Sequence, residues 1–90
     1  MEAKHEGTIS LDQLPEASWA TVAGVSLPAD PAGRNLVLRL LELGFVPGER
    51  VHVVSEGRPG REPLAIRLGH TTFALRRAEA ALIEVTPSPR

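Results

Sequence analysis

The chain has 90 residues, of which 42% are hydrophobic, so it is long enough for one small domain and too short for two. Cysteine is absent, which excludes disulfides and thiolate metal sites, and the formal net charge of −1 gives no long-range attraction to nucleic acid or to an anionic membrane. The only aromatic residues are Trp19, Phe45 and Phe73, too few for the stacking platforms that bind single-stranded nucleic acid.

The first segment, residues 1–8, is polar and lacks the apolar stretch of a signal peptide. No apolar run elsewhere reaches the ~20 residues that cross a bilayer as a helix. We therefore expect a flexible N-terminal end at residues 1–8 and a cytoplasmic protein without direct membrane insertion.

A short strand and a helix are predicted next. Residues 19–25 alternate large and small side chains, as a strand does. Asp30 can cap a helix that begins at Pro31, with Asn35 as an alternative cap. The helix would bury an apolar face and turn a polar face to water. The apolar positions are Leu36, Leu40 and Leu43, flanked by Val37 and Leu41, and the polar ones are Arg34, Arg39 and Glu42.

Glycine and proline mark the end of this helix and the turn that follows. Gly44 can adopt the left-handed conformation that terminates a helix, so that Phe45 packs back on Leu40. In residues 46–49, Pro47 presets the first central angle of a tight turn and Gly48 accepts the positive φ of the second. A helix stop and a turn therefore lie back to back.

The second half of the chain has the period of β-strands. Val51 and Val53 predict a half-buried strand, and residues 57–63, with two glycines and two prolines, predict an exposed loop. Residues 64–68 and 71–75 form a hairpin around Gly69, in a type II′ turn that directs Phe73 and Leu75 to the core. A helical turn at residues 76–81, a closing strand at 82–86 and a tail at 87–90 complete the chain.

This pattern predicts a mainly β fold. About five short antiparallel strands, with one α-helix between the first two and a short helical turn before the last, are typical of a small, partly open β-barrel. Closure of the barrel also protects strand edges that a flat sheet of this size would expose.

Two segments stand out, residues 40–48, Leu-Leu-Glu-Leu-Gly-Phe-Val-Pro-Gly, and residues 74–80, Ala-Leu-Arg-Arg-Ala-Glu-Ala. Together, at their mutual spacing, they resemble the FeoA family. The resemblance covers residues 9–86, which we take as one domain, and it implies an SH3-like barrel. It also implies a cytosolic accessory of the ferrous iron transporter FeoB that acts at the transporter's GTP-binding cytoplasmic region. The same fold is similar to the C-terminal domain of DtxR-type repressors, so the alternative is a divalent-metal-sensing module.

Candidate metal ligands are sparse. The three histidines share neither a helix at four-residue spacing nor a strand at two-residue spacing. Because Glu49 could approach His52 across neighbouring strands, His52, His70 and Glu49 could form a weak surface site for zinc or iron. Solvated side chains are the simpler interpretation, and we expect no required cofactor.

No catalytic pattern is present. The sequence has no cysteine and no GxxxxGK[ST] phosphate-binding loop. None of its serines has a histidine at a recognisable motif distance. We therefore expect no enzyme activity and no nucleic-acid partner, and we look instead for a protein partner. The candidate contact residues are the helix positions Leu41, Leu43 and Phe45, the loop arginines Arg58 and Arg61, and the pair Arg76 and Arg77.

Overall fold

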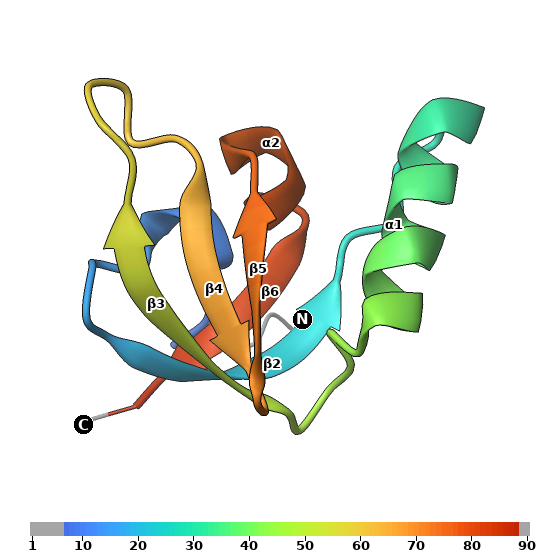
Figure 1. Ribbon diagram of the computed structural model, residues 1–90. Coiled ribbons are helices and arrows are strands. Elements are labelled where there is room, and N and C mark those ends of the chain that lie inside the picture. Colours follow the sequence, from blue (N-terminus) through green and yellow to red (C-terminus); the bar gives the residue numbers. More distant parts are fainter. Residues whose placement is uncertain (1–6, 89–90) are drawn as a thin grey trace.

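The computed structural model describes residues 7–88, and these form a six-stranded antiparallel sheet with two short helices and one α-helix of thirteen residues (Figure 1). The strands are β1 (Ile9–Ser10), β2 (Trp19–Val25), β3 (Arg50–Glu56), β4 (Leu64–Leu68), β5 (Thr71–Leu75) and β6 (Ile83–Pro87). The helices are the 3₁₀ turn η1 (Leu11–Gln13), α1 (Pro31–Leu43) and α2 (Arg77–Ala80).

The sheet curls into a partly open barrel with the strand order β1-β6-β2-β3-β4-β5. Register shifts between Val22 and Gly24 in β2, and between Val53 and Ser55 in β3, mark irregularities of the kind that bend strands. Among the described residues β1 and β5 are the two edges of the sheet, so β5 pairs with β4 on one side only.

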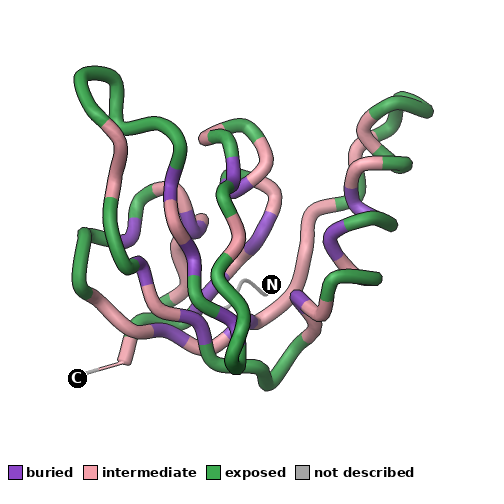
Figure 2. The backbone as a smooth tube through the Cα atoms, viewed as in Figure 1, coloured by how far each residue is buried: buried purple, intermediate pink, exposed green. Residues whose placement is uncertain are grey.

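The core lies inside this curl and consists of aliphatic side chains with one phenylalanine (Figure 2). The strands place alternate residues inward, as their period of two predicts: Val51 and Val53 from β3, and Leu64 and Ile66 from β4, are at most 1% exposed. Phe45 is fully buried and meets Phe73 at a tilted angle with ring centroids 5.6 Å apart. No polar or charged residue among those described is buried.

Helix α1 begins and ends as the sequence predicts. The carboxylate of Asp30 accepts a hydrogen bond from the backbone N–H of Gly33 at 2.9 Å, and Pro31 occupies the first turn. Gly44 ends the helix in the left-handed conformation with φ +116, and the Phe45 N–H donates to the Leu40 carbonyl at 3.1 Å. The turn at residues 46–49 also forms, with φ +96 at Gly48.

The helix stands beside the barrel rather than across its open end (Figure 1). Val37 and Leu40 are buried, but of the two only Leu40 joins the main core cluster, while Leu38 remains 57% exposed. The C-terminal half of α1 is thus anchored to the barrel, and its N-terminal half projects from it.

Several boundaries differ from the sequence-based expectation. We expected about five strands, but Ile9 and Ser10 form a further strand, β1, because they pair with Val85 and Glu84 of β6. Strand β6 extends to Pro87, where we expected the tail to start, because Pro87 lies opposite Ala20. The expected flexible end at residues 1–8 and the tail at 87–90 lie partly outside the described residues, which begin at Gly7 and end at Ser88.

Candidate functional site

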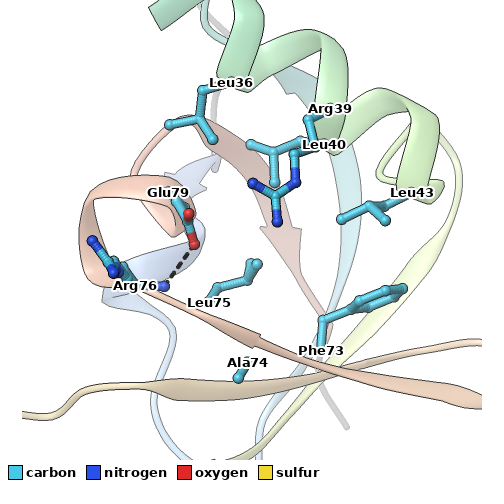
Figure 3. Close-up of a pocket in the computed structure, with 9 residues that line it drawn as sticks. All are labelled: Leu36, Arg39, Leu40, Leu43, Phe73, Ala74, Leu75, Arg76 and Glu79. Atoms are coloured by element: carbon cyan, nitrogen blue, oxygen red, sulfur yellow. Dashed lines mark hydrogen bonds between the residues drawn. The ribbon is translucent and has the colours of Figure 1, made fainter. Parts of the chain in front are cut away.

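A groove lies between α1 and β5, and we call it the α1–β5 groove (Figure 3). Its volume is about 500 Å³, within the range of protein sites that bind ligands or peptides. The residues that line it come from α1, from β5 and from the chain just after β5. They are Leu36, Arg39, Leu40, Leu43, Phe73, Ala74, Leu75, Arg76 and Glu79.

The apolar wall of the groove follows from two periodicities. Leu36, Leu40 and Leu43 recur at spacings of four and three and so share one face of α1. On β5, Phe73 and Leu75 are two residues apart and point to the same side of the sheet. Figure 3 shows the leucines of α1 and these two side chains facing each other. Because Leu36 and Phe73 are only half-buried and Leu43 is exposed, part of this apolar surface remains accessible to a partner.

Charge at the groove is mainly positive. Figure 3 shows the guanidinium of Arg39 reaching from α1 toward β5, and Arg76 lies at the end of the strand. The one acidic residue of the lining, Glu79, accepts a hydrogen bond from the backbone N–H of Arg76 at 2.8 Å. This contact caps the first turn of α2, so the Glu79 carboxylate has a structural role. An anionic group entering the groove would meet Arg39, whereas Figure 3 shows the Arg76 guanidinium directed away from Arg39.

A second, smaller hollow lies on the other side of α1. Its lining includes Leu27, Leu38 and Leu41, and its volume is about 260 Å³. Leu27 is 81% exposed, so this surface is apolar and open. It is distinct from the α1–β5 groove, and Leu41, one of the candidate contact residues, belongs here.

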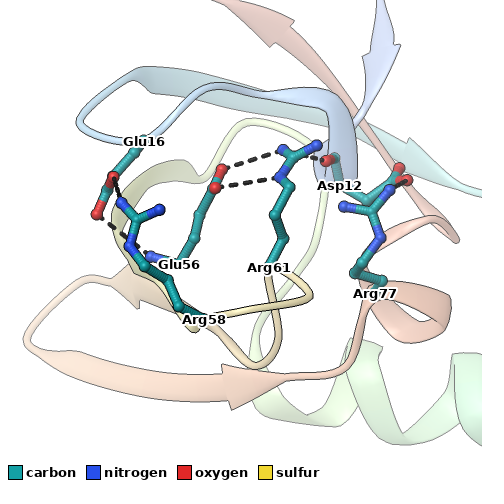
Figure 4. Close-up of polar contacts among 6 residues, drawn as sticks. All are labelled: Asp12, Glu16, Glu56, Arg58, Arg61 and Arg77. Carbon is teal, nitrogen blue, oxygen red and sulfur yellow. Dashed lines mark hydrogen bonds and ion pairs between the residues drawn. The ribbon is translucent and has the colours of Figure 1, made fainter.

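The loop at residues 57–63 follows the C-terminal end of β3 and is held by ion pairs (Figure 4). Arg61 donates two hydrogen bonds to the Glu56 carboxylate, at 3.1 and 3.0 Å, and one to the Asp12 carbonyl at 3.4 Å. Arg77 lies 3.5 Å from the Asp12 carboxylate, and its backbone N–H donates to Glu62 at 2.9 Å. These contacts tie the loop to η1 and α2.

The Arg61 hydrogen bonds lower the pKa of Glu56 below its ordinary value of 4.5, against a smaller opposing effect of desolvation. A carboxylate whose pKa is lower in the folded state stabilises the fold above its unfolded pKa, and this stabilisation is lost as the pH falls through the folded value. Wild-type protein should therefore be more stable than Glu56→Gln at pH 7, and the difference should shrink below pH 4.5.

Urea unfolding of both proteins between pH 3 and pH 7 would measure this, since acid protonation of paired carboxylates is the expected mechanism. Arg61→Ala should show the same reduced pH dependence as Glu56→Gln, because it removes the donor. A stability difference that stays constant across this pH range would contradict the assignment.

The structure does not assemble the predicted metal ligands into a cluster. Among residues 7–88 no group of three histidine, cysteine, aspartate or glutamate side chains is placed to hold a metal ion. The His52 ring instead stacks on Trp19, with ring centroids 4.4 Å apart and planes 15° apart. His70 is exposed in the turn between β4 and β5. His52, His70 and Glu49 stay a prediction of a weak surface site.

The predicted contact residues fall into separate regions. Leu43 and Arg76 line the α1–β5 groove. Phe45 must be removed from the candidate contacts, because it is fully buried. Arg61 and Arg77 are engaged in the loop network, while Arg58 is 80% exposed and lies 3.9 Å from Glu16. From the sequence, Arg39 was expected only on the polar side of the helix, and Leu36 and Phe73 were not recognised as partly exposed.

The described residues thus form a small, partly open β-barrel with a groove that leucines, Phe73 and charged side chains line. The part of the chain that the structure describes contains no helix long and apolar enough to span a membrane. The family model of the FeoA domain matches residues 9–87. The chain therefore belongs to the FeoA family, the accessory proteins of iron transport.

Solved structures agree with this assignment. Stenotrophomonas maltophilia FeoA, solved in complex with zinc and described as an SH3 domain protein, is 40% identical, with a TM-score of 0.75 over 89% of this chain and 95% of that one. Chlorobium tepidum FeoA is 30% identical, with a TM-score of 0.69 over 88% of this chain and 70% of that one. These neighbours confirm the predicted mainly β, SH3-like fold.

The fold also occurs in metal-dependent repressors. A manganese-dependent transcriptional repressor superposes with a TM-score of 0.76 over 97% of this chain and 45% of its own, at 19% identity. At that identity the likeness concerns the fold alone. No curated protein sequence matches the chain.

Proposed function

We propose that this protein is a cytoplasmic, non-enzymatic accessory of a FeoB-type ferrous iron transporter, and that it binds the GTP-binding cytoplasmic region of that transporter through the α1–β5 groove. Membership of the FeoA family supports a role in iron transport. The observation that carries the proposal is the groove itself, an accessible hollow whose lining combines leucines and Phe73 with charged side chains.

The composition of the groove suits a protein partner. Interfaces obtain most of their binding energy from a few central apolar or aromatic side chains and arginines, surrounded by contacts that exclude water. Phe73 offers an aromatic ring, Leu36 and Leu43 offer aliphatic surface, and Arg39 offers a cation that reaches into the hollow (Figure 3). A rigid barrel holds these groups in place, so binding would order few additional residues.

Calorimetric titration with the purified cytoplasmic region of the transporter from the same organism tests the proposal, in both nucleotide states. Arg39→Glu should weaken binding by ~10-fold or more, since it replaces a favourable charge contact by a repulsive one. Arg58→Glu is a matched control, because it reverses the charge of an exposed arginine that does not line the groove, and it should leave the affinity nearly unchanged.

Two results would reject the proposal. One is the absence of wild-type binding at tens of micromolar in both nucleotide states. The other is binding that Arg39→Glu and Arg58→Glu reduce equally, which would place the contact outside the groove.

Divalent-metal sensing has weaker support. A related FeoA from Stenotrophomonas maltophilia was solved with zinc. Within residues 7–88 of this chain, however, His52 and His70 gain no third ligand that would complete a site. Partner binding is therefore the function that the described geometry favours.

A further inference from the structure

We propose that the partner enters the α1–β5 groove as an extended segment that pairs with β5 as a seventh strand, and that this segment carries apolar side chains and at least one acidic side chain. This inference rests on the proposed function, and it specifies how the transporter's cytoplasmic region would bind. It follows from the free edge of β5, from the apolar walls and from the charge of the groove.

The register of the β4–β5 hairpin shows which backbone groups are free. Gly69 and His70 form a two-residue turn, so the pair that closes the hairpin, Leu68 and Thr71, is hydrogen-bonded. Pairs alternate along an antiparallel ladder, so Thr72 and Ala74 belong to the non-bonded positions. Their N–H and C=O groups therefore point away from β4, toward the unpaired edge, where no residue among those described pairs with β5.

This edge borders the groove. Ala74 is part of the groove lining, and Figure 3 shows its side chain directed away from α1. Ala74 thus presents mainly its backbone to the hollow. A free strand edge is a template for main-chain pairing, and peptide-binding domains use such edges by adding a strand from the partner. A helical partner would satisfy its own backbone groups and leave those of Thr72 and Ala74 unpaired.

The walls of the groove would contact the side chains of the added strand and so select among partner sequences. Alternate residues of a strand point to opposite faces of the sheet, so every second side chain would follow the side of Phe73 and Leu75. That side is the one that faces the leucines of α1 (Figure 3). Apolar side chains at these positions would bury Leu36 and Phe73, which are half-buried without a partner.

Charge selects an acidic segment over a basic one. Arg39 reaches into the groove (Figure 3), and no described residue forms an ion pair or hydrogen bond with its guanidinium. Arg76 adds a second positive charge, while the Glu79 carboxylate already caps the backbone of Arg76. A carboxylate beside Arg39 would form charge-assisted hydrogen bonds, whereas a lysine or arginine would be repelled.

Ala74→Pro tests strand addition, because it deletes the outward N–H of β5 while leaving the bonds to β4. Proline is tolerated on edge strands where the N–H faces solvent. The control is Ala74→Val, which enlarges the same exposed side chain and keeps the N–H. Binding of the transporter's purified cytoplasmic region, and of ten-residue synthetic peptides that tile its sequence, would be measured by calorimetry. Ala74→Pro should weaken binding by ~10-fold or more, and Ala74→Val by less than ~2-fold.

Amide exchange of the wild-type protein supplies an independent measurement that does not depend on the folding of a variant. Saturation with the cytoplasmic region should slow exchange at Thr72 and Ala74 by ~10-fold or more, because their N–H groups become hydrogen-bonded. Wild-type binding without this protection, or equal affinities for a folded Ala74→Pro and the wild type, would overturn strand addition and leave the proposed function intact. Absence of any wild-type binding would instead reject the proposed function itself, and strand addition with it.

Discussion

Phe45→Ala should reduce the free energy of unfolding by about 3–5 kcal/mol, the range found when a fully buried phenylalanine is truncated. Phe45 is 0% exposed and is the largest fully buried side chain of the described core. Its removal would forfeit the buried ring, leave a cavity, and delete the tilted contact with Phe73. The same change would loosen the connection between the end of α1 and the barrel.

Urea denaturation followed by circular dichroism would measure this loss. Phe45→Leu is the matched control, because it keeps an apolar side chain of similar reach and should cost considerably less than Phe45→Ala. A loss below ~1 kcal/mol for Phe45→Ala would mean that Phe45 is not packed in the core as described.

Gly44→Val should destabilise the protein by about 1–3 kcal/mol through backbone strain. Gly44 has φ +116, a conformation that a β-branched residue rarely adopts. A Cβ at this position would also lie 3.1 Å from Cδ2 of Leu68, so the Leu68 side chain would have to shift. Thermal or urea unfolding measures the cost.

Gly44→Asn separates the two contributions. Asparagine tolerates left-handed conformations better than valine, while its Cβ meets Leu68 in the same way. Gly44→Asn should therefore lose less stability than Gly44→Val. Equal losses would assign the effect to crowding of Leu68, and a neutral Gly44→Val would mean that α1 does not end at this glycine.

Local chemistry made most of the fold predictable from the sequence. The cap at Asp30, the stop at Gly44 and the turn at Gly48 each depend on one residue type in one backbone conformation, and all three form as expected. Alternation likewise placed Val51 and Val53 in the core. Strand β1 was not predicted, because a segment of two residues is too short to show an alternating pattern. It is a strand because it pairs with β6.

The groove was less predictable because it depends on tertiary position. Leucines at helical spacing indicate a buried face, but the sequence does not show that α1 stands beside the barrel and leaves Leu43 exposed. Nor does it show that β5 is a sheet edge, since this follows from the order of all six strands in the described chain. Conversely, Arg61 and Arg77 were predicted as candidate contact residues, but in the structure they form ion pairs with Glu56 and Asp12. These partners are distant or unmarked in the sequence.

The one-sided attachment of α1 has a mechanical consequence. Leu40 and Phe45 fix its C-terminal half, whereas its N-terminal half lies outside the main core cluster. Segments with few buried contacts separate from a domain at low free-energy cost. We therefore expect α1 to open first at the end that begins with Pro31, so that backbone amides there exchange with solvent faster than those near Leu40.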